Sequence, residues 1–130
     1  MELISTKICK TSDIGVNDNL FGGTLLAWMD EAAGALASTA CCTPNMITLK
    51  INEVLFKEAV KVKEHLKLYG KVLGIGKSSI KIGVEARRVS FVDKSEILVC
   101  STNMLFVRIN EKGKAIPIDE DVRVNIVKSF

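Results

Sequence analysis

Two adjacent carboxylates, Asp30 and Glu31, lie in the middle of an otherwise apolar stretch. They are the only charged residues between Asn19 and Leu49. A buried charge is costly unless it is solvated, paired or used in catalysis. A carboxylate can act as a general base or as a nucleophile toward a carbonyl carbon. Asp30 is therefore a candidate catalytic residue, although a structural carboxylate bonded to a neighbouring loop explains it as well.

The segment that carries these carboxylates is predicted to be one long helix from Thr24 to about Ala40. It is rich in Ala, Leu and Met, and Pro44 ends it. Apolar side chains recur around it, so we expect it to be buried nearly all round. Gly22 and Gly23 come directly before it, where unpaired backbone N–H groups at a helix start can face developing negative charge.

The rest of the chain is mainly strand-forming. Alternating apolar residues predict antiparallel strands near residues 47–56, 65–72 and 80–87. Residues 3–10 are expected to form a first, edge strand, and residues 97–109 are apolar at both parities, which predicts a central strand. The alternation slips after Ile51, which predicts a β-bulge near Asn52 and Glu53. Residues 118–130 favour a short helix capped by Asp119 over a further strand.

This order predicts an α+β fold in a single domain, residues 1–130. The antiparallel sheet of five or six strands has to wrap around the one long central helix in order to bury it. Such a sheet leaves long edge strands, and edges of this length are usually paired or covered. We therefore expect at least a homodimer.

Composition excludes several classes of protein. The formal charge of +3 is small and scattered, which is weak support for nucleic-acid binding, and the acidic start Met1-Glu2 is atypical of an export signal. The central Asp-Glu pair argues against a membrane span. The four cysteines lack zinc or redox spacing and are predicted to be reduced core thiols, and the single His65 excludes a metal site with several histidines. We expect a cytoplasmic protein without a metal site or a membrane partner.

Several motifs together resemble a known family. They are Phe21-Gly22-Gly23 followed by Trp28-Met29-Asp30, Ile47-Thr48 with Phe56 eight residues after Thr48, Gly76-Lys77-Ser78-Ser79-Ile80, and Leu105-Phe106-Val107 before a turn that contains Gly113. In this set the chain resembles the hotdog-fold acyl-CoA thioesterases, in particular the bacterial cytosolic acyl-CoA hydrolase group. The resemblance covers nearly the whole chain.

The resemblance implies hydrolysis of acyl-CoA to a free carboxylic acid and CoA, without metal or other cofactor, in a homodimer or a hexameric trimer of dimers. Asp30 takes the place of the family's catalytic carboxylate, acting across the dimer interface, with Gly23 at the site of the activating amides. Glu31 is expected to serve a salt bridge or an interface.

The chain departs from the family pattern ahead of the glycine pair. The family usually has Asn-x-x-Gly there, and this chain has Gly15 and Asp18 at those positions. Asn17 could supply the missing amide if the loop shifts, or it could be there for backbone conformation alone.

The CoA moiety is expected to bind at residues that match the family's CoA-binding stretches: Gly22, Phe56, Gly76, Lys77, Ser78 and Ser79. An ordinary hairpin turn with a solvated Lys77 explains the Gly76–Ser79 stretch equally well, and Trp28, Met29 and Phe56 can be core residues as readily as a lining for the acyl chain.

Two other functions remain open. A non-catalytic acyl-CoA-binding domain, a sensor or scaffold, would bind CoA esters and leave them intact, because a shared fold does not fix a function. A hotdog hydratase would need a histidine near the helix carboxylate, but the strand pattern places His65 on the solvated face.

Overall fold

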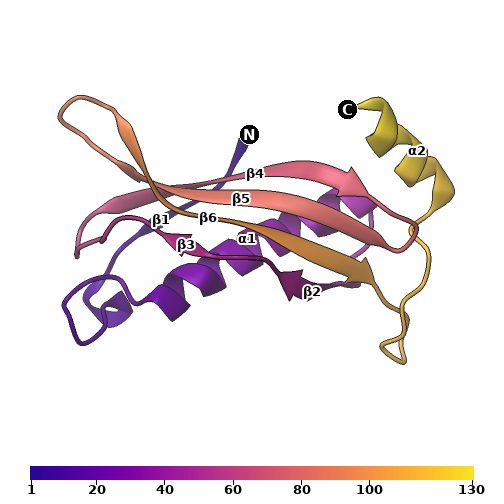
Figure 1. Ribbon diagram of the computed structural model, residues 1–130, viewed down its shortest axis with the longest axis horizontal. Helices are drawn as coiled ribbons and strands as arrows, with labels where there is room; N and C mark the ends of the chain where they lie inside the picture. The colour runs from indigo at the N-terminus through magenta and orange to yellow at the C-terminus, as the bar shows by residue number, and fades with distance from the viewer.

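One antiparallel sheet curves around one long helix in the computed structural model, which describes residues 1–130 (Figure 1). The elements in chain order are β1 (Glu2–Ile8), a 3₁₀ turn (Thr11–Asp13), α1 (Gly22–Cys41), β2 (Met46–Ile51), β3 (Leu55–Phe56), β4 (His65–Ile75), β5 (Ser79–Val89), β6 (Glu96–Arg108) and α2 (Glu120–Lys128). This is the predicted hotdog arrangement, with a six-stranded sheet and a second, short helix.

The strand order is β1-β4-β5-β6-β2, and β3 also pairs with β6. All pairings are antiparallel. The predicted first strand is at one edge, the β4–β5 hairpin is in the middle, and β6 has neighbours on both sides. β1 and β2 are therefore the two edges of the sheet, and each has a free side.

The core lies between α1 and the inner face of the sheet. Met29, Ala33 and Ala37 of α1 are fully buried against strand residues that alternate as the sequence predicts. Those fully buried strand residues include Leu66, Leu68, Ile80, Ile82, Val84, Met104 and Phe106. The opposite parity of β4 and β5 points to the outer face of the sheet.

Helix α1 begins at Gly22, two residues before the predicted start, and ends at Cys41. Cys42 follows in the left-handed conformation (φ 56°), and its backbone N–H donates to Thr39 O at 3.4 Å. Within a single protomer, the prediction that α1 is buried nearly all round is wrong. Every fourth residue stays exposed, at positions 23, 27, 31, 35 and 39, because the sheet covers only one side of the helix.

The predicted β-bulge is displaced. The register of β2 against β6 shifts between Thr48 and Lys50, so Leu49 is the extra residue and its side chain is 62% exposed. After β2, residues 52–54 are not part of a strand, although the Asn52 N–H still donates to Asn103 O of β6 at 2.9 Å. The chain pairs with β6 again at β3.

Two smaller expectations also need correction. Asp119 is at the start of α2, but its side chain makes no capping hydrogen bond and instead accepts one from Arg108 Nη1 at 3.2 Å. Cys42 is exposed, whereas Cys9, Cys41 and Cys100 are buried free thiols as predicted, and burial raises the pKa of Cys41 and Cys100 to about 11. Neither helix combines the length and the apolar character that a membrane span requires.

Candidate functional site

Asp30 lies just over two turns into α1 and faces the edge strand β2. Its side chain is half-buried, and the Thr48 hydroxyl donates a hydrogen bond to Asp30 Oδ1 at 2.6 Å. No lysine or arginine is within ion-pair distance of Asp30. The carboxylate thus has one neutral donor and keeps further lone pairs free to accept a proton.

Thr48 belongs to the motifs that carry the family resemblance, but the sequence reasoning gave it no role in the site. In β2 the apolar Ile47 and Leu49 alternate with Thr48. The structure turns Thr48 toward α1 and leaves Ile47 and Leu49 exposed. A hydroxyl among apolar strand residues opposite a helix carboxylate was the available signal.

The start of α1 forms a second group of predicted site residues. The Phe56 ring lies 3.5 Å from where a Cβ on Gly22 would be, and the Phe21 ring lies 2.8 Å from the same point on Gly23. Both rings are more than half exposed. The first N–H groups of the helix have no acceptor within the helix. Gly22, Gly23 and Phe56 are therefore brought together, beside unpaired backbone donors.

These donors and Asp30 are separated along the helix. Gly22 precedes Asp30 by eight residues, which at the rise of an α-helix is about 12 Å. A thioester carbonyl is a few ångströms across, so one chain alone does not place the donors and the carboxylate around the same carbonyl.

The loop before α1 contains Asn17. Ile14 and Leu20 are bridged across this loop, and Asp18 is in the left-handed conformation (φ 59°). Asn17 is exposed, and the loop amide that makes a side-chain hydrogen bond is that of Asn19, which accepts from Lys61 Nζ at 3.2 Å. Gly15 lies under the Phe21 ring, which would be 3.1 Å from a Cβ at that position. A larger residue at Gly15 would displace the ring.

The predicted CoA stretch, Gly76 to Ser79, is the turn between β4 and β5. It lies at the end of the sheet away from Phe21 and Gly22 (Figure 1). The turn is tied to the C-terminal segment, because Ile118 N–H donates to Lys77 O, and to the end of β6, because Arg108 N–H donates to Ser78 O. The Lys77 side chain is exposed. Within one chain, this stretch is therefore far from Gly22 and Phe56.

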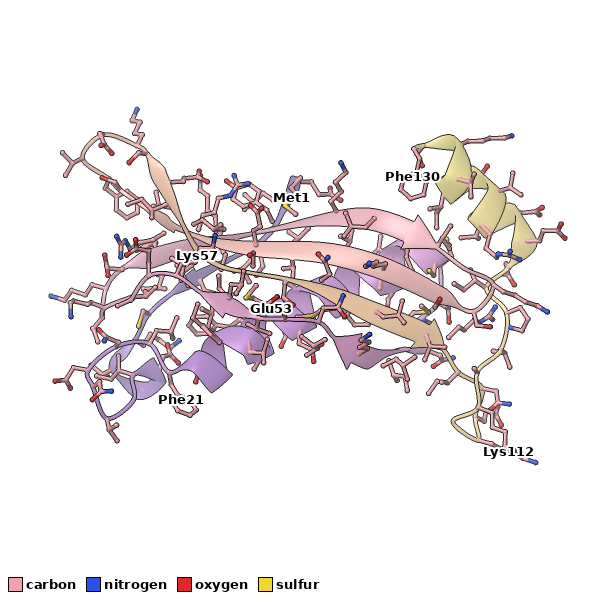
Figure 2. All side chains as sticks on the ribbon, in the orientation of Figure 1. Met1, Phe21, Glu53, Lys57, Lys112 and Phe130 are labelled. Carbon is pink, nitrogen blue, oxygen red and sulfur yellow. The ribbon has the colours of Figure 1, made fainter.

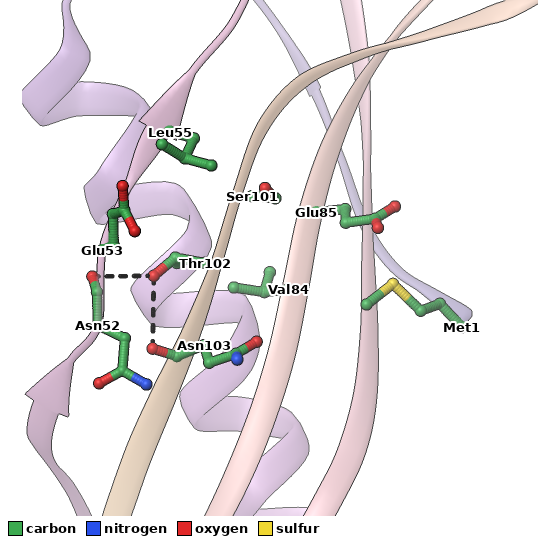
Figure 3. Close-up of a pocket in the computed structure, with 9 residues that line it drawn as sticks. All are labelled: Met1, Asn52, Glu53, Leu55, Val84, Glu85, Ser101, Thr102 and Asn103. Atoms are coloured by element: carbon green, nitrogen blue, oxygen red, sulfur yellow. Dashed lines mark hydrogen bonds between the residues drawn. The ribbon is translucent and has the colours of Figure 1, made fainter.

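A hollow of about 440 Å³ opens on the outer side of the sheet where β2 leaves β6 (Figure 3). Its lining includes Asn52, Glu53, Glu85 and Asn103, and the Thr102 hydroxyl donates to Asn52 O at 3.2 Å beside it. No residue of α1 and none of the predicted site residues line this hollow, so it is separate from Asp30.

His65 does not complete a carboxylate–histidine pair. Its ring packs edge-on against Phe91, with centroids 4.9 Å apart, and Asp30 bonds to Thr48 alone. The arrangement gives no support to a hydratase.

Comparisons with known proteins agree on one family. The family model described as "Thioesterase superfamily" matches residues 17–90. An uncharacterized acyl-CoA thioester hydrolase from Zymomonas mobilis is 29% identical over 80% of this chain and 69% of its own. Another from Haemophilus influenzae is 26% identical over 98% of this chain and 84% of its own.

Among solved structures, a hexameric hotdog-fold thioesterase from Campylobacter jejuni superposes with a TM-score of 0.85. It is 28% identical and covers 100% of this chain, with 98% of its own chain matched.

Proposed function

The chain belongs to the thioesterase superfamily, and we propose that it hydrolyses the thioester bond of an acyl-CoA, releasing a free carboxylic acid and CoA. The observation that carries this proposal is the half-buried Asp30 carboxylate, held by the Thr48 hydroxyl and free of any cation. The names of the relatives, acyl-CoA thioester hydrolases, supply the substrate class.

The proposed reaction uses Asp30 in one of two roles. As a general base, Asp30 takes a proton from a water molecule while the water oxygen attacks the thioester carbonyl carbon. As a nucleophile, Asp30 attacks that carbon itself, and water then hydrolyses the resulting anhydride. In both cases the C–S bond breaks, the CoA thiolate leaves and is protonated, and no metal or bound cofactor takes part.

Single-turnover hydrolysis in H₂¹⁸O can establish the nucleophilic role. If water attacks the Asp30 carbonyl of the anhydride, the label enters the Asp30 carboxylate and the released acid carries none, an outcome that a general base does not give. A general base leaves Asp30 unlabelled and puts the label into the released acid, which attack at the acyl carbonyl of the anhydride also does, so in that case trapping of the anhydride with hydroxylamine decides between the two roles.

The negative charge that develops on the carbonyl oxygen needs hydrogen-bond donors, and the backbone N–H groups at Gly22 and Gly23 are suited to this. Because about 12 Å of helix separates them from Asp30, we propose that donors and carboxylate come from different protomers. The free edge of β2, with exposed Ile47 and Leu49, supplies the surface for such a homodimer.

In this proposal the partner subunit also brings the turn from Gly76 to Ser79 toward the helix start, so that Lys77 and the serine hydroxyls can bind CoA phosphates. A trimer of dimers agrees with the hexameric relative of known structure. Asn17 orients the attacking water if its loop shifts. A cytoplasmic location remains a prediction.

One observation favours the non-catalytic alternative. The position of the family's asparagine holds Gly15, and the Phe21 ring lies where an asparagine side chain would begin. A protein without that amide could still bind CoA esters.

The deciding experiment is release of free CoA thiol from acyl-CoAs of acetyl to palmitoyl chain length, with wild type and Asp30→Asn side by side. We expect hydrolysis by wild type and almost none by the variant. No release from any substrate, with CoA-ester binding by calorimetry, would establish the binding-domain alternative. A stable monomer in light scattering, with full activity, would contradict the two-subunit site.

A further inference from the structure

Helix α2 lies against β4 and α1, far from the start of α1. Phe130, just after α2, and Phe21, just before α1, are at opposite ends of the molecule (Figure 2). Val122 and Ile126 fix α2 in place, because both pack against the core. Most of its other residues are exposed, so α2 has a face that nothing in its own chain covers.

This face borders a groove of about 370 Å³, here called the α2 groove. Val124 and Val127 in it are 45% and 56% exposed, and Phe130 beyond them is 64% exposed. Exposed apolar side chains that adjoin one another indicate a contact site, whereas single ones need no explanation. The lining consists of Ile75 at the end of β4 and, from α2, Glu120, Arg123, Val124, Val127 and Lys128.

The charged residues of the α2 groove have no ion-pair partner within the chain. Glu120 is in the first turn of α2 and Lys128 is in the last. Each lies four residues from Val124, on opposite sides of it. A second α2 that runs antiparallel and crosses at Val124 would therefore place its Lys128 beside Glu120 and its Glu120 beside Lys128. This is the self-complementarity that a two-fold interface requires.

We propose that the α2 groove is an interface between copies of this chain, in which α2 pairs antiparallel with α2 of a copy from a neighbouring dimer. The valines pack at the centre, and one Glu120–Lys128 ion pair closes each end. A helix of nine residues is about 14 Å long, so one such pair buries less than the roughly 1,200 Å² of a standard interface. The α2 pair is therefore too small to hold two isolated chains together.

A small contact suffices between dimers, because each dimer presents two α2 grooves. The inference rests on the proposed homodimer through β2, which is the edge of the sheet farthest from the β1–β4 pair. With two different two-fold interfaces in each chain, three dimers can close into a ring of six chains. Every dimer in the closed ring is held at two points, so the contacts reinforce one another.

Light scattering of the intact protein tests the α2 pair by its mass in solution, whether or not the protein hydrolyses thioesters. Wild type should have the mass of six chains. Val124→Asp puts two carboxylates at the centre of each α2 pair, so the mass should fall to that of two chains. Asn125→Asp is the matched control, because it adds the same charge at the next, exposed position outside the groove and should keep the wild-type mass.

Charge exchange separates pairing between copies from an effect within one helix. Glu120→Lys and Lys128→Glu should each weaken the α2 contact roughly tenfold, because both of its ion pairs become like-charge pairs. The double variant restores both pairs and should assemble as wild type does. If the two residues only complemented the dipole of their own helix, the double variant would instead assemble worst of the three.

Three results would overturn the α2 pair: an unchanged mass in Val124→Asp, an equal loss of mass in Asn125→Asp, or a double variant that assembles no better than the single ones. A Val124→Asp protein that falls to single chains would support the α2 pair and contradict the β2 homodimer. The two proposed interfaces therefore fail in different ways.

Discussion

Glu96 and Asp30 lie on opposite sides of the same sheet, and their hydrogen-bond and ion-pair partners differ. On the outer face, Glu96 accepts a hydrogen bond from the Tyr69 hydroxyl at 2.7 Å and lies 3.5 Å from Lys67 Nζ. The Tyr69 bond first, and then the nearby cations, lower the pKa of Glu96. On the inner side, Asp30 has only the neutral Thr48 hydroxyl at 2.6 Å.

The outer-face residues also bind one another. Arg87 donates to Glu85 at 2.6 Å, and its guanidinium lies 4.2 Å from the centre of the Tyr69 ring. Charges paired in this way cross-link three neighbouring strands and leave little capacity for a substrate. The difference predicts that Asp30, held by one neutral hydroxyl, stays available for chemistry whereas Glu96 does not, and this can be tested by exchanging each carboxylate for its amide.

The largest effect is expected from Asp30→Asn. The amide can still accept the Thr48 hydrogen bond, so folding should be unchanged, but it cannot take a proton from water. We expect thioester hydrolysis to fall roughly 10³-fold, within the range for loss of a general base. Kinetics of CoA thiol release measure this, and thermal unfolding at fixed protein concentration checks the fold.

Glu31→Gln is the matched control for that variant, because Glu31 is the neighbouring carboxylate, is exposed, and has no ion-pair partner. Its activity should stay within about threefold of wild type, the span left by a surface substitution of about 0.5 kcal/mol. An equal loss in both variants would show that the helix charge as a whole, and not Asp30, matters.

The next effect is expected from Thr48→Val, which keeps the shape of the side chain and removes its hydroxyl. Asp30 would then lose its one fixed orientation, and misplacing a catalytic group lowers kcat by about tenfold to a hundredfold. Thr48→Ser restores the hydroxyl and should recover most of the rate. Unchanged kcat in Thr48→Val would show that this hydrogen bond does not position the carboxylate.

Glu96→Gln should show the opposite behaviour: little change in hydrolysis and a loss of stability of roughly 0.5–1 kcal/mol. Because the pKa of Glu96 is lowered in the folded state, its contribution is present above the unfolded glutamate pKa of about 4.3 and fades as the pH falls through the folded value. Urea unfolding of both proteins between pH 7 and pH 3 should therefore show two curves that converge at low pH. If the difference in unfolding free energy stayed constant with pH, the ionised carboxylate would not be its cause.

Much of the fold follows from sequence periodicity. The alternation in β4 and β5 correctly assigned Leu66, Leu68, Ile80 and Ile82 to the inner face, because a central strand has one core to face. The same rule failed in β2. As an edge strand with a register shift, it turns Ile47 and Leu49 away from α1 and directs Thr48 toward Asp30.

The candidate site was harder to predict for a related reason. Asp30 could be found from its apolar surroundings, but its hydroxyl partner lies 18 residues away and depends on the β2 register. The exposed strip of α1 was also missed, because apolar and small residues on a helix do not reveal whether the covering surface belongs to the same chain.

Asp119→Ala extends the comparison to a third carboxylate and should have the smallest effect. The Asp119 side chain is 72% exposed, makes no capping bond to α2, and meets Arg108 Nη1 at 3.2 Å, a nitrogen that also donates to Pro117 O at 3.0 Å. An exposed ion pair of this kind contributes about 0–1 kcal/mol, and the arginine keeps its second acceptor. We expect a change in unfolding free energy below about 0.5 kcal/mol. A loss of unfolding free energy above about 1 kcal/mol would show that the Asp119 carboxylate does cap α2 in solution. The place of Asp119 at the helix start would then matter more than its bond to Arg108.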